Sequence, residues 1–142
     1  MSLELDPSIH DKIVVLSKEG DDLSNGAHYS EARAKYIEAL KLLPDHPSNW
    51  EAATWLFVAI GDTHFLSENF EKMMKAFSNA VQCPGGLGNP FIHLRLGQAY
   101  WELNELDKSA DELTRAYMGG GMDIFMEDDP KYLEFLETRI EM

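Results

Sequence analysis

The stretches KEGDDLSNGAHYSEARAKYIEALKLLP (residues 18–44) and LGQAYWELNELDKSADELTRAY (residues 96–117) share one spacing of small and large residues. Each contains a glycine, Gly20 or Gly97, that is followed by a large apolar residue sixteen positions later and by an alanine nineteen positions later. Small residues allow two helices to approach closely, and large apolar residues fill the space around such a contact. Each stretch therefore predicts two packed helices.

A third stretch, AIGDTHFLSENFEKMMKAFSNAV (residues 59–81), carries the same offsets from Gly61. It departs from the other two at Met73, where they have a small residue. Successive glycines of the three copies are separated by 41 and 36 residues. Self-similarity at a period of this size is the sequence signature of a helical repeat protein.

This pattern resembles the tetratricopeptide repeat, a helix-turn-helix unit of about 34 residues. The resemblance covers roughly Ile13 to Asp123 and is to the small stand-alone bacterial type. It implies an all-α fold, a right-handed α-solenoid of three helix hairpins with a C-terminal capping helix, in a single domain over residues 1–142. The implied units are repeats at about 13–46, 49–87 and 90–123 and a capping helix at about 130–140.

Helix boundary signals agree with this division. Ser8, Ser48 and Asn104 each precede an acidic residue by three positions, which is the spacing of a capping box. Asn89 and Asp129 each precede a proline, which is tolerated in the first turn because the missing N–H has no helical partner there. The predicted helices are 8–24, 29–43, 49–66, 70–82, 90–103, 106–118 and 130–140.

The charge of the chain restricts its partners. Its 142 residues include 25 acidic and 12 basic side chains, which gives a net charge of −13. Such a surface repels phosphate backbones and anionic lipids, so we expect binding to neither nucleic acid nor membrane. The acidic surface either serves only to keep the protein soluble or steers a basic protein partner toward it.

Cysteine content and apolar patterning indicate the cytoplasm. A single cysteine cannot form an internal disulfide, which fits a reducing compartment. No apolar run approaches the roughly 20 residues of a membrane span. The start, MSLELDPSIH, lacks the basic and apolar regions of a secretion signal. We therefore expect a cytoplasmic protein, and a monomer or weak homodimer.

The glycine-rich stretch CPGGLGNP (residues 83–90) allows two interpretations. The favoured one is a turn, in which prolines and glycines end one helix and begin the next. The alternative is an active site, with Cys83 as nucleophile and His93 or His64 as its base. Neither the histidines nor the acid-rich stretch at residues 119–130 has the spacing of a metal site, so we expect no metal and no other cofactor.

The resemblance implies where a partner binds. In this family the first helices of successive repeats line a concave groove that receives a peptide or an extended segment of another protein. Aromatic residues at these positions would anchor the segment, and acidic ones would select a basic or amide-rich sequence. The predicted groove residues are Ser17, Asp21, Trp55, Asp62, Phe65, Phe91, Arg95, Gln98, Trp101 and Glu102.

One family partner is excluded by the same comparison. Co-chaperone members hold a C-terminal carboxylate with two lysines, two asparagines and an arginine, whose charges and amide donors converge on the ligand. Those five places are Ser17, Asp21, Ala59, Phe91 and Arg95 in this sequence, so only the arginine is present. The C-terminal tail of a heat-shock chaperone is therefore not an expected partner.

The sequence thus predicts a non-enzymatic protein-interaction module that binds a basic, extended partner segment in its concave groove. A more specific version is an immunity or chaperone-type partner of a basic protein. Two alternatives belong to other classes. One is a small cytoplasmic enzyme that uses Cys83 or a His/Asp pair, and the other is a self-assembling structural repeat protein whose end faces stack.

Overall fold

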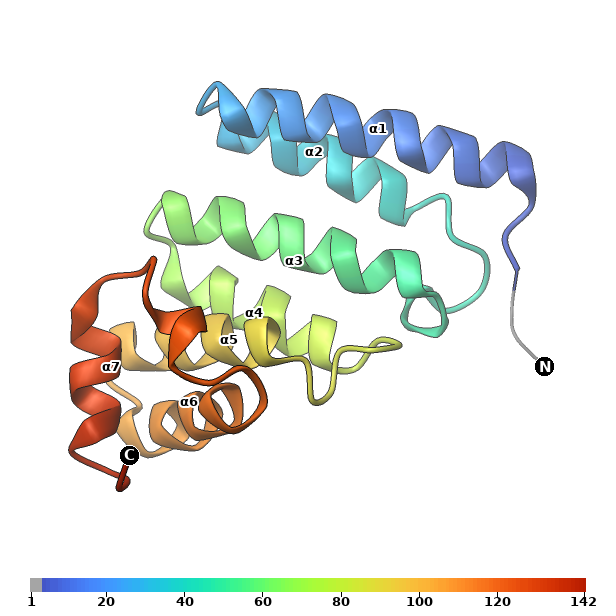
Figure 1. Ribbon diagram of the computed structural model, residues 1–142. Coiled ribbons are helices and arrows are strands. Elements are labelled where there is room, and N and C mark those ends of the chain that lie inside the picture. The colour runs from blue at the N-terminus through green and yellow to red at the C-terminus, as the bar shows by residue number, and fades with distance from the viewer. Residues whose placement is uncertain (1–3) are drawn as a thin grey trace.

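The computed structural model describes residues 4–142, and helices are the regular secondary structure of that range (Figure 1). The all-α prediction is confirmed. The seven α-helices are α1 (Pro7–Asn25), α2 (Tyr29–Leu40), α3 (Glu51–Leu66), α4 (Phe70–Val81), α5 (Pro90–Glu102), α6 (Leu106–Gly120) and α7 (Pro130–Glu137). Two short 3-10 helices that the sequence did not predict are η1 (Pro47–Asn49) and η2 (Met122–Phe125).

The first six α-helices pack in pairs, α1 with α2, α3 with α4 and α5 with α6. The pairs stack through α2 on α3 and α4 on α5, which gives the solenoid arrangement seen in Figure 1. The last helix, α7, covers the end of the stack, where Tyr132 and Leu136 are buried against Leu113 of α6. Within residues 4–142, no helix combines the length and the apolar character that crossing a membrane requires.

The recurring glycines set how closely each helix pair packs. A side chain at any of them would overlap the large residue sixteen positions later, because even a Cβ atom would come closer to it than van der Waals contact allows. The pairs, with the distance from the position a Cβ would take, are Gly20 and Tyr36 (2.6 Å), Gly61 and Phe77 (2.5 Å), and Gly97 and Leu113 (2.7 Å).

The helix caps agree only partly with the sequence signals. Asn89 and Asp129 cap α5 and α7 as predicted, each accepting backbone N–H bonds from the first turn. The other three predicted caps are wrong. Ser8 lies inside α1, Ser48 lies in η1 ahead of α3, and Asn104 takes a positive φ of 61° in the turn before α6. None of the three is therefore the N-cap residue of the helix it was expected to cap; those positions are held by Asp6, Trp50 and Glu105.

His64 is buried in the last turn of α3, with 8% of its surface exposed. Its Nδ1 finds no hydrogen-bond partner among residues 4–142. Burial, and then the nearby charges of Arg33 and Lys72, lower the pKa of this imidazole from 6.5 to about 4. His64 is therefore a neutral packing residue at neutral pH.

Replacing Gly61 with alanine tests the glycine constraint. Alanine favours an exposed helix over glycine by about 1 kcal/mol, yet here its methyl group would overlap the ring of Phe77. We expect Gly61→Ala to lower the free energy of unfolding by about 1–3 kcal/mol in urea denaturation. Adding Phe77→Leu should recover part of that loss in a double-mutant cycle. A Gly61→Ala protein as stable as the wild type would contradict the constraint.

The buried His64 predicts a pH dependence of stability. Below pH 6.5 the unfolded chain takes up a proton that the folded imidazole accepts only near pH 4, so the free energy of unfolding falls as the pH is lowered through this window. The difference between the two pKa values corresponds to about 3 kcal/mol. His64→Gln should remove this part of the loss. Parallel stability curves for wild type and variant between about pH 4 and 7 would rule the assignment out.

Candidate binding groove

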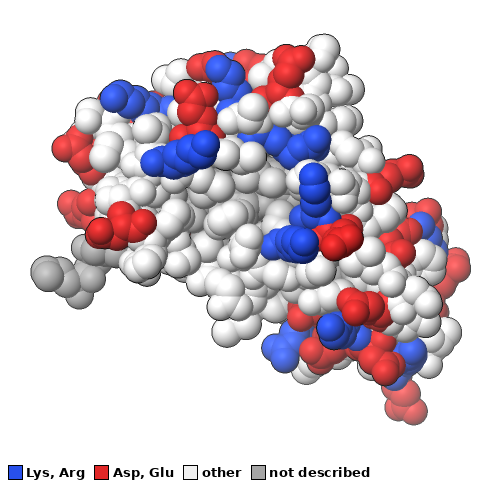
Figure 2. Space-filling model, turned by 180° about the vertical axis from the view of Figure 1, so that it is seen from behind, with Lys and Arg blue, Asp and Glu red and all other residues white. Residues whose placement is uncertain are grey.

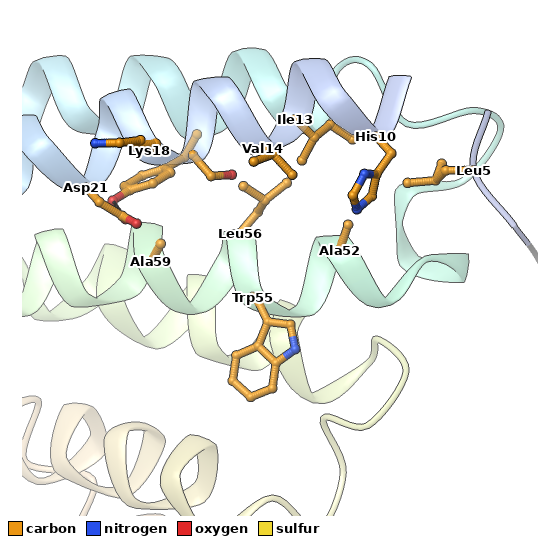
Figure 3. Close-up of a pocket in the computed structure, with 12 residues that line it drawn as sticks. Leu5, His10, Ile13, Val14, Lys18, Asp21, Ala52, Trp55, Leu56 and Ala59 are labelled. Atoms are coloured by element: carbon orange, nitrogen blue, oxygen red, sulfur yellow. Dashed lines mark hydrogen bonds between the residues drawn. The ribbon is translucent and has the colours of Figure 1, made fainter. Parts of the chain in front are cut away.

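A groove runs between α1 and α3, because both helices pack on α2 and leave space between each other. Its central cavity has a volume of about 490 Å³. Tyr36 of α2 lines it, and Ile13 of α1 and Leu56 of α3 form its buried apolar walls. Figure 3 shows the side chains of α1 and α3 facing each other across this space.

The groove continues beyond the central cavity at both ends. Toward the start of α1 and α3, a cavity of about 600 Å³ shares Leu5, His10 and Trp55 with the central one. Toward the other ends of the two helices, a cavity of about 340 Å³ shares Asp21 and Tyr36 with it. The three cavities therefore form one groove along α1 and α3.

Two large apolar side chains border the groove and are open to solvent. Val14 is 52% exposed and Trp55 is 49% exposed. In Figure 3 Val14 points into the space between the helices, whereas the Trp55 ring projects from α3 on the side away from α1. Trp55 thus forms a rim of the groove, and the two residues give it an exposed apolar surface.

Carboxylates gather at the end of the groove that lies toward the C-terminal ends of α1 and α3. Asp21 accepts a hydrogen bond of 2.6 Å from the Tyr36 hydroxyl, and burial, followed by this carboxylate, raises the pKa of Tyr36. Asp62 accepts a bond of 3.3 Å from Nε of Arg95. Burial raises the pKa of Asp62, and the charge of Asp128 adds to the effect, while Arg95 opposes it. The end of the groove therefore carries excess negative charge.

Arg95 marks the boundary of the open groove. Its guanidinium lies between the rings of Phe65 and Phe91, 4.8 Å from each centroid. Its Nη1 donates to Asp128 over 3.1 Å, in addition to the bond that Nε makes with Asp62. This arginine, expected to face a partner, is already held by two rings and two carboxylates of its own chain.

A segment after α6 fills the C-terminal half of the predicted groove. We call residues 121–131 the strap; in Figure 1 it is the orange-red segment that passes in front of α5. Fully buried Gln98 donates from Nε2 to Asp128 over 3.1 Å. Lys131 bonds Glu102 at 2.9 Å and lies over the ring of Trp101.

The predicted site residues thus fall into two groups. Ser17, Asp21, Trp55 and Asp62 line the open groove between α1 and α3. The others, Phe65, Phe91, Arg95, Gln98, Trp101 and Glu102, contact one another or the strap. Sequence reasoning did not identify the strap residues Asp128 and Lys131, because they lie outside the predicted repeats. It also missed the role of the Tyr36 hydroxyl, because the position of Tyr36 in the repeat indicated only a core residue.

The glycine-rich turn between α4 and α5 is fixed by two side chains. Thr54 of α3 donates to the carbonyl oxygen of Pro84 over 2.7 Å. The N–H of Gly88 donates to Nε2 of His93 over 2.9 Å. Because Nε2 is an acceptor, Nδ1 of His93 carries the proton and donates to Glu112. This histidine therefore holds the turn and is not paired with the cysteine.

Cys83 has the surroundings of a structural cysteine. It is 5% exposed, and its thiol donates to the carbonyl oxygen of Asn79 over 3.3 Å. Burial raises its pKa, which disfavours the thiolate that a nucleophile requires. Among residues 4–142, no three His, Cys, Asp or Glu side chains come together as a set of metal ligands.

Charge is distributed unevenly between the two sides of the stack. The second helices α2, α4 and α6 together carry six acidic and six basic residues, and Figure 2 shows both signs interspersed on the face opposite that of Figure 1. The first helices α1, α3 and α5 carry seven acidic and three basic residues. Residues 121–142 carry seven acidic and two basic residues. Among the six paired helices, the second helices carry no net charge, and the net charge of −4 on the first helices lies on α1 and α3, which border the groove.

Comparison with known proteins identifies the fold. No family model matches the chain, and no curated protein matches it by sequence. Among solved structures, the N-terminal domain of stress-induced protein-1 (STI-1) from C. elegans matches with a TM-score of 0.71 and 15% sequence identity. The match covers 94% of this chain and 98% of that domain. The fold is therefore of the tetratricopeptide-like helical type.

Removal of Asp128 tests whether the strap is held by its carboxylate. Asp128→Ala leaves the buried amide N–H of Gln98 without its acceptor and removes one of the two carboxylates that pair with Arg95. We expect the free energy of unfolding to fall by about 1–3 kcal/mol in urea denaturation followed by tryptophan fluorescence. The exposed neighbour Glu127→Ala is the matched control and should change it by no more than about 0.5 kcal/mol. Equal stability of the two variants would contradict this account.

Proposed function

We propose that this protein is a non-enzymatic interaction module that binds an extended segment of another protein in the groove between α1 and α3. The observation that carries the proposal is the exposed apolar surface of Val14 and Trp55 along a groove that residues 4–142 leave open. Exposed apolar surface of this kind is typical of binding sites, and tryptophan is frequent among residues that dominate interface energetics.

The shape of the groove favours a segment of chain over a compact ligand. The three cavities follow α3, whose 16 residues give it a length of about 24 Å at 1.5 Å per residue. An extended peptide rises about 3.3 Å per residue, so about seven residues would fill this length. The groove is also open to solvent along the exposed Val14 and Trp55, so a chain can enter from the side.

The acidic character of the groove helices favours a basic partner. Their excess of carboxylates would accelerate encounter with a positively charged protein and disfavour acidic competitors. An immunity or chaperone-type role toward a basic protein is the specific form of this proposal. The proposal also covers the organisation of the protein: a single domain with repeats at about 13–46, 49–87 and 90–123. It places the protein in the cytoplasm, as a monomer or weak homodimer.

The strap limits the proposed site to the first half of the predicted groove. Arg95, Gln98 and Glu102 make their hydrogen bonds within the chain, so their polar groups serve the structure. Ser17, Asp21, Trp55 and Asp62 are the predicted residues that a partner segment would contact, together with Val14.

Selection from a random displayed dodecapeptide library on the immobilised full chain tests this function. Peptides that are enriched should bind the wild type in fluorescence polarisation and lose at least about tenfold in affinity for Trp55→Ala and for Val14→Asp. Leu66→Ala is the matched control, because Leu66 is an equally exposed apolar residue of α3, 58% exposed, that lines none of the three cavities. No enriched peptides, or peptides that bind both groove variants unchanged, would contradict the proposal.

A further inference from the structure

The groove contains two neighbouring compartments of opposite character. The apolar compartment is the part of the central cavity bordered by Ile13, Val14, Ala52 and Leu56. Ile13 and Leu56 are almost fully buried in its walls, while Val14 is open at its edge. Such a compartment gains free energy when an apolar side chain displaces water from it.

The acidic compartment is the cavity of about 340 Å³ at the far end of α1 and α3. Asp21, Ser24 and Asn25 of α1 face Asp62 of α3 across it. All of these side chains can accept hydrogen bonds, and the described residues that line the cavity include no lysine or arginine. The compartment therefore favours a ligand group that donates hydrogen bonds and carries positive charge.

The charges around the acidic compartment are not balanced by the residues that the structure describes. Asp62 shares its cationic partner, Arg95, with Asp128, and Asp21 is bonded by the neutral hydroxyl of Tyr36. Asp62 and Asp128 thus share one guanidinium, and Asp21 forms no ion pair with a described residue. A second cation placed between Asp21 and Asp62 would restore the balance, and the raised pKa of Asp62 is the consequence expected of burial in such surroundings.

We infer that the groove recognises a segment in which an apolar residue and a Lys or Arg lie two to four positions apart. The apolar side chain occupies the compartment beside Val14 and Leu56, and the cation lies between Asp21 and Asp62. This inference rests on the proposed function and specifies the chemistry of its ligand.

The spacing follows from helix geometry. Val14 precedes Asp21 by seven residues, and Leu56 precedes Asp62 by six. At 1.5 Å per residue, the two compartments are about 10 Å apart along the groove. An extended chain covers this distance in about three residues, and the long side chain of Lys or Arg allows one residue more or less.

An array of serine- and alanine-based decapeptides tests the inference. Each peptide carries one leucine and one lysine, separated by one to eight positions in either order, and is probed with the labelled full chain. Binding should peak at separations of two to four and fall about tenfold when the lysine is replaced with glutamine or glutamate. A flat dependence on separation, or equal binding of the glutamine or glutamate peptides, would overturn the inference.

Variants of the chain assign the effect to the acidic compartment. Asp21→Asn and Asp62→Asn keep the size of the side chain, and the amide oxygen introduced by Asp21→Asn can still accept the bond from Tyr36, so their folding can be checked by circular dichroism. Together they should abolish the preference for lysine over glutamine. Asp22→Asn is the matched control, because Asp22 is the neighbouring exposed carboxylate and does not line the groove.

The outcomes separate the inference from the proposed function. If library peptides depend on Trp55 but show no preference for lysine that Asp21 and Asp62 control, the inference fails and the proposed function stands. If neither the library nor the array yields peptides that depend on Trp55, both fail. A lysine preference that survives in the double variant would place the cation elsewhere and overturn the inference.

Discussion

The absence of a side chain at one position of each hairpin constrains the whole stack. At Gly20 the constraint also shapes the groove, because the Tyr36 ring that packs against this glycine lines the groove and directs its hydroxyl to Asp21. The corresponding residues of the other two hairpins, Phe77 and Leu113, have no hydroxyl. One packing contact thus positions both the helices and the polar end of the groove, and it does so only in the first hairpin.

Arg95 divides the predicted groove into an open and a closed half. On one side it pairs with Asp62, which belongs to the groove, and on the other it pairs with Asp128, which belongs to the strap. Its position between two aromatic rings keeps the guanidinium in place for both contacts. The charge of the arginine is thereby used within the chain, and the groove next to it remains acidic.

Much of the fold could be predicted from the sequence, because the glycine offsets and the caps at Asn89 and Asp129 are local signals. Which part of the groove is open and which is covered could not be predicted. Whether Gln98 and Trp101 face a partner depends on where the chain runs after α6, and no periodicity governs that path. Ser48 and Asn104 show a related limit, since a capping spacing says nothing about a preceding 3-10 helix or a positive φ.

The strap has a further consequence for how stability is distributed. It ties α5 to α7, and Arg95 extends this network to α3, whereas the α1–α2 hairpin is joined to the stack mainly through α2 on α3. Elements with fewer supporting contacts open more readily than the rest of a protein. A segment bound between α1 and α3 would bridge the least supported hairpin to the most supported part of the stack. Ligand binding and local folding of α1 are then coupled, and each strengthens the other.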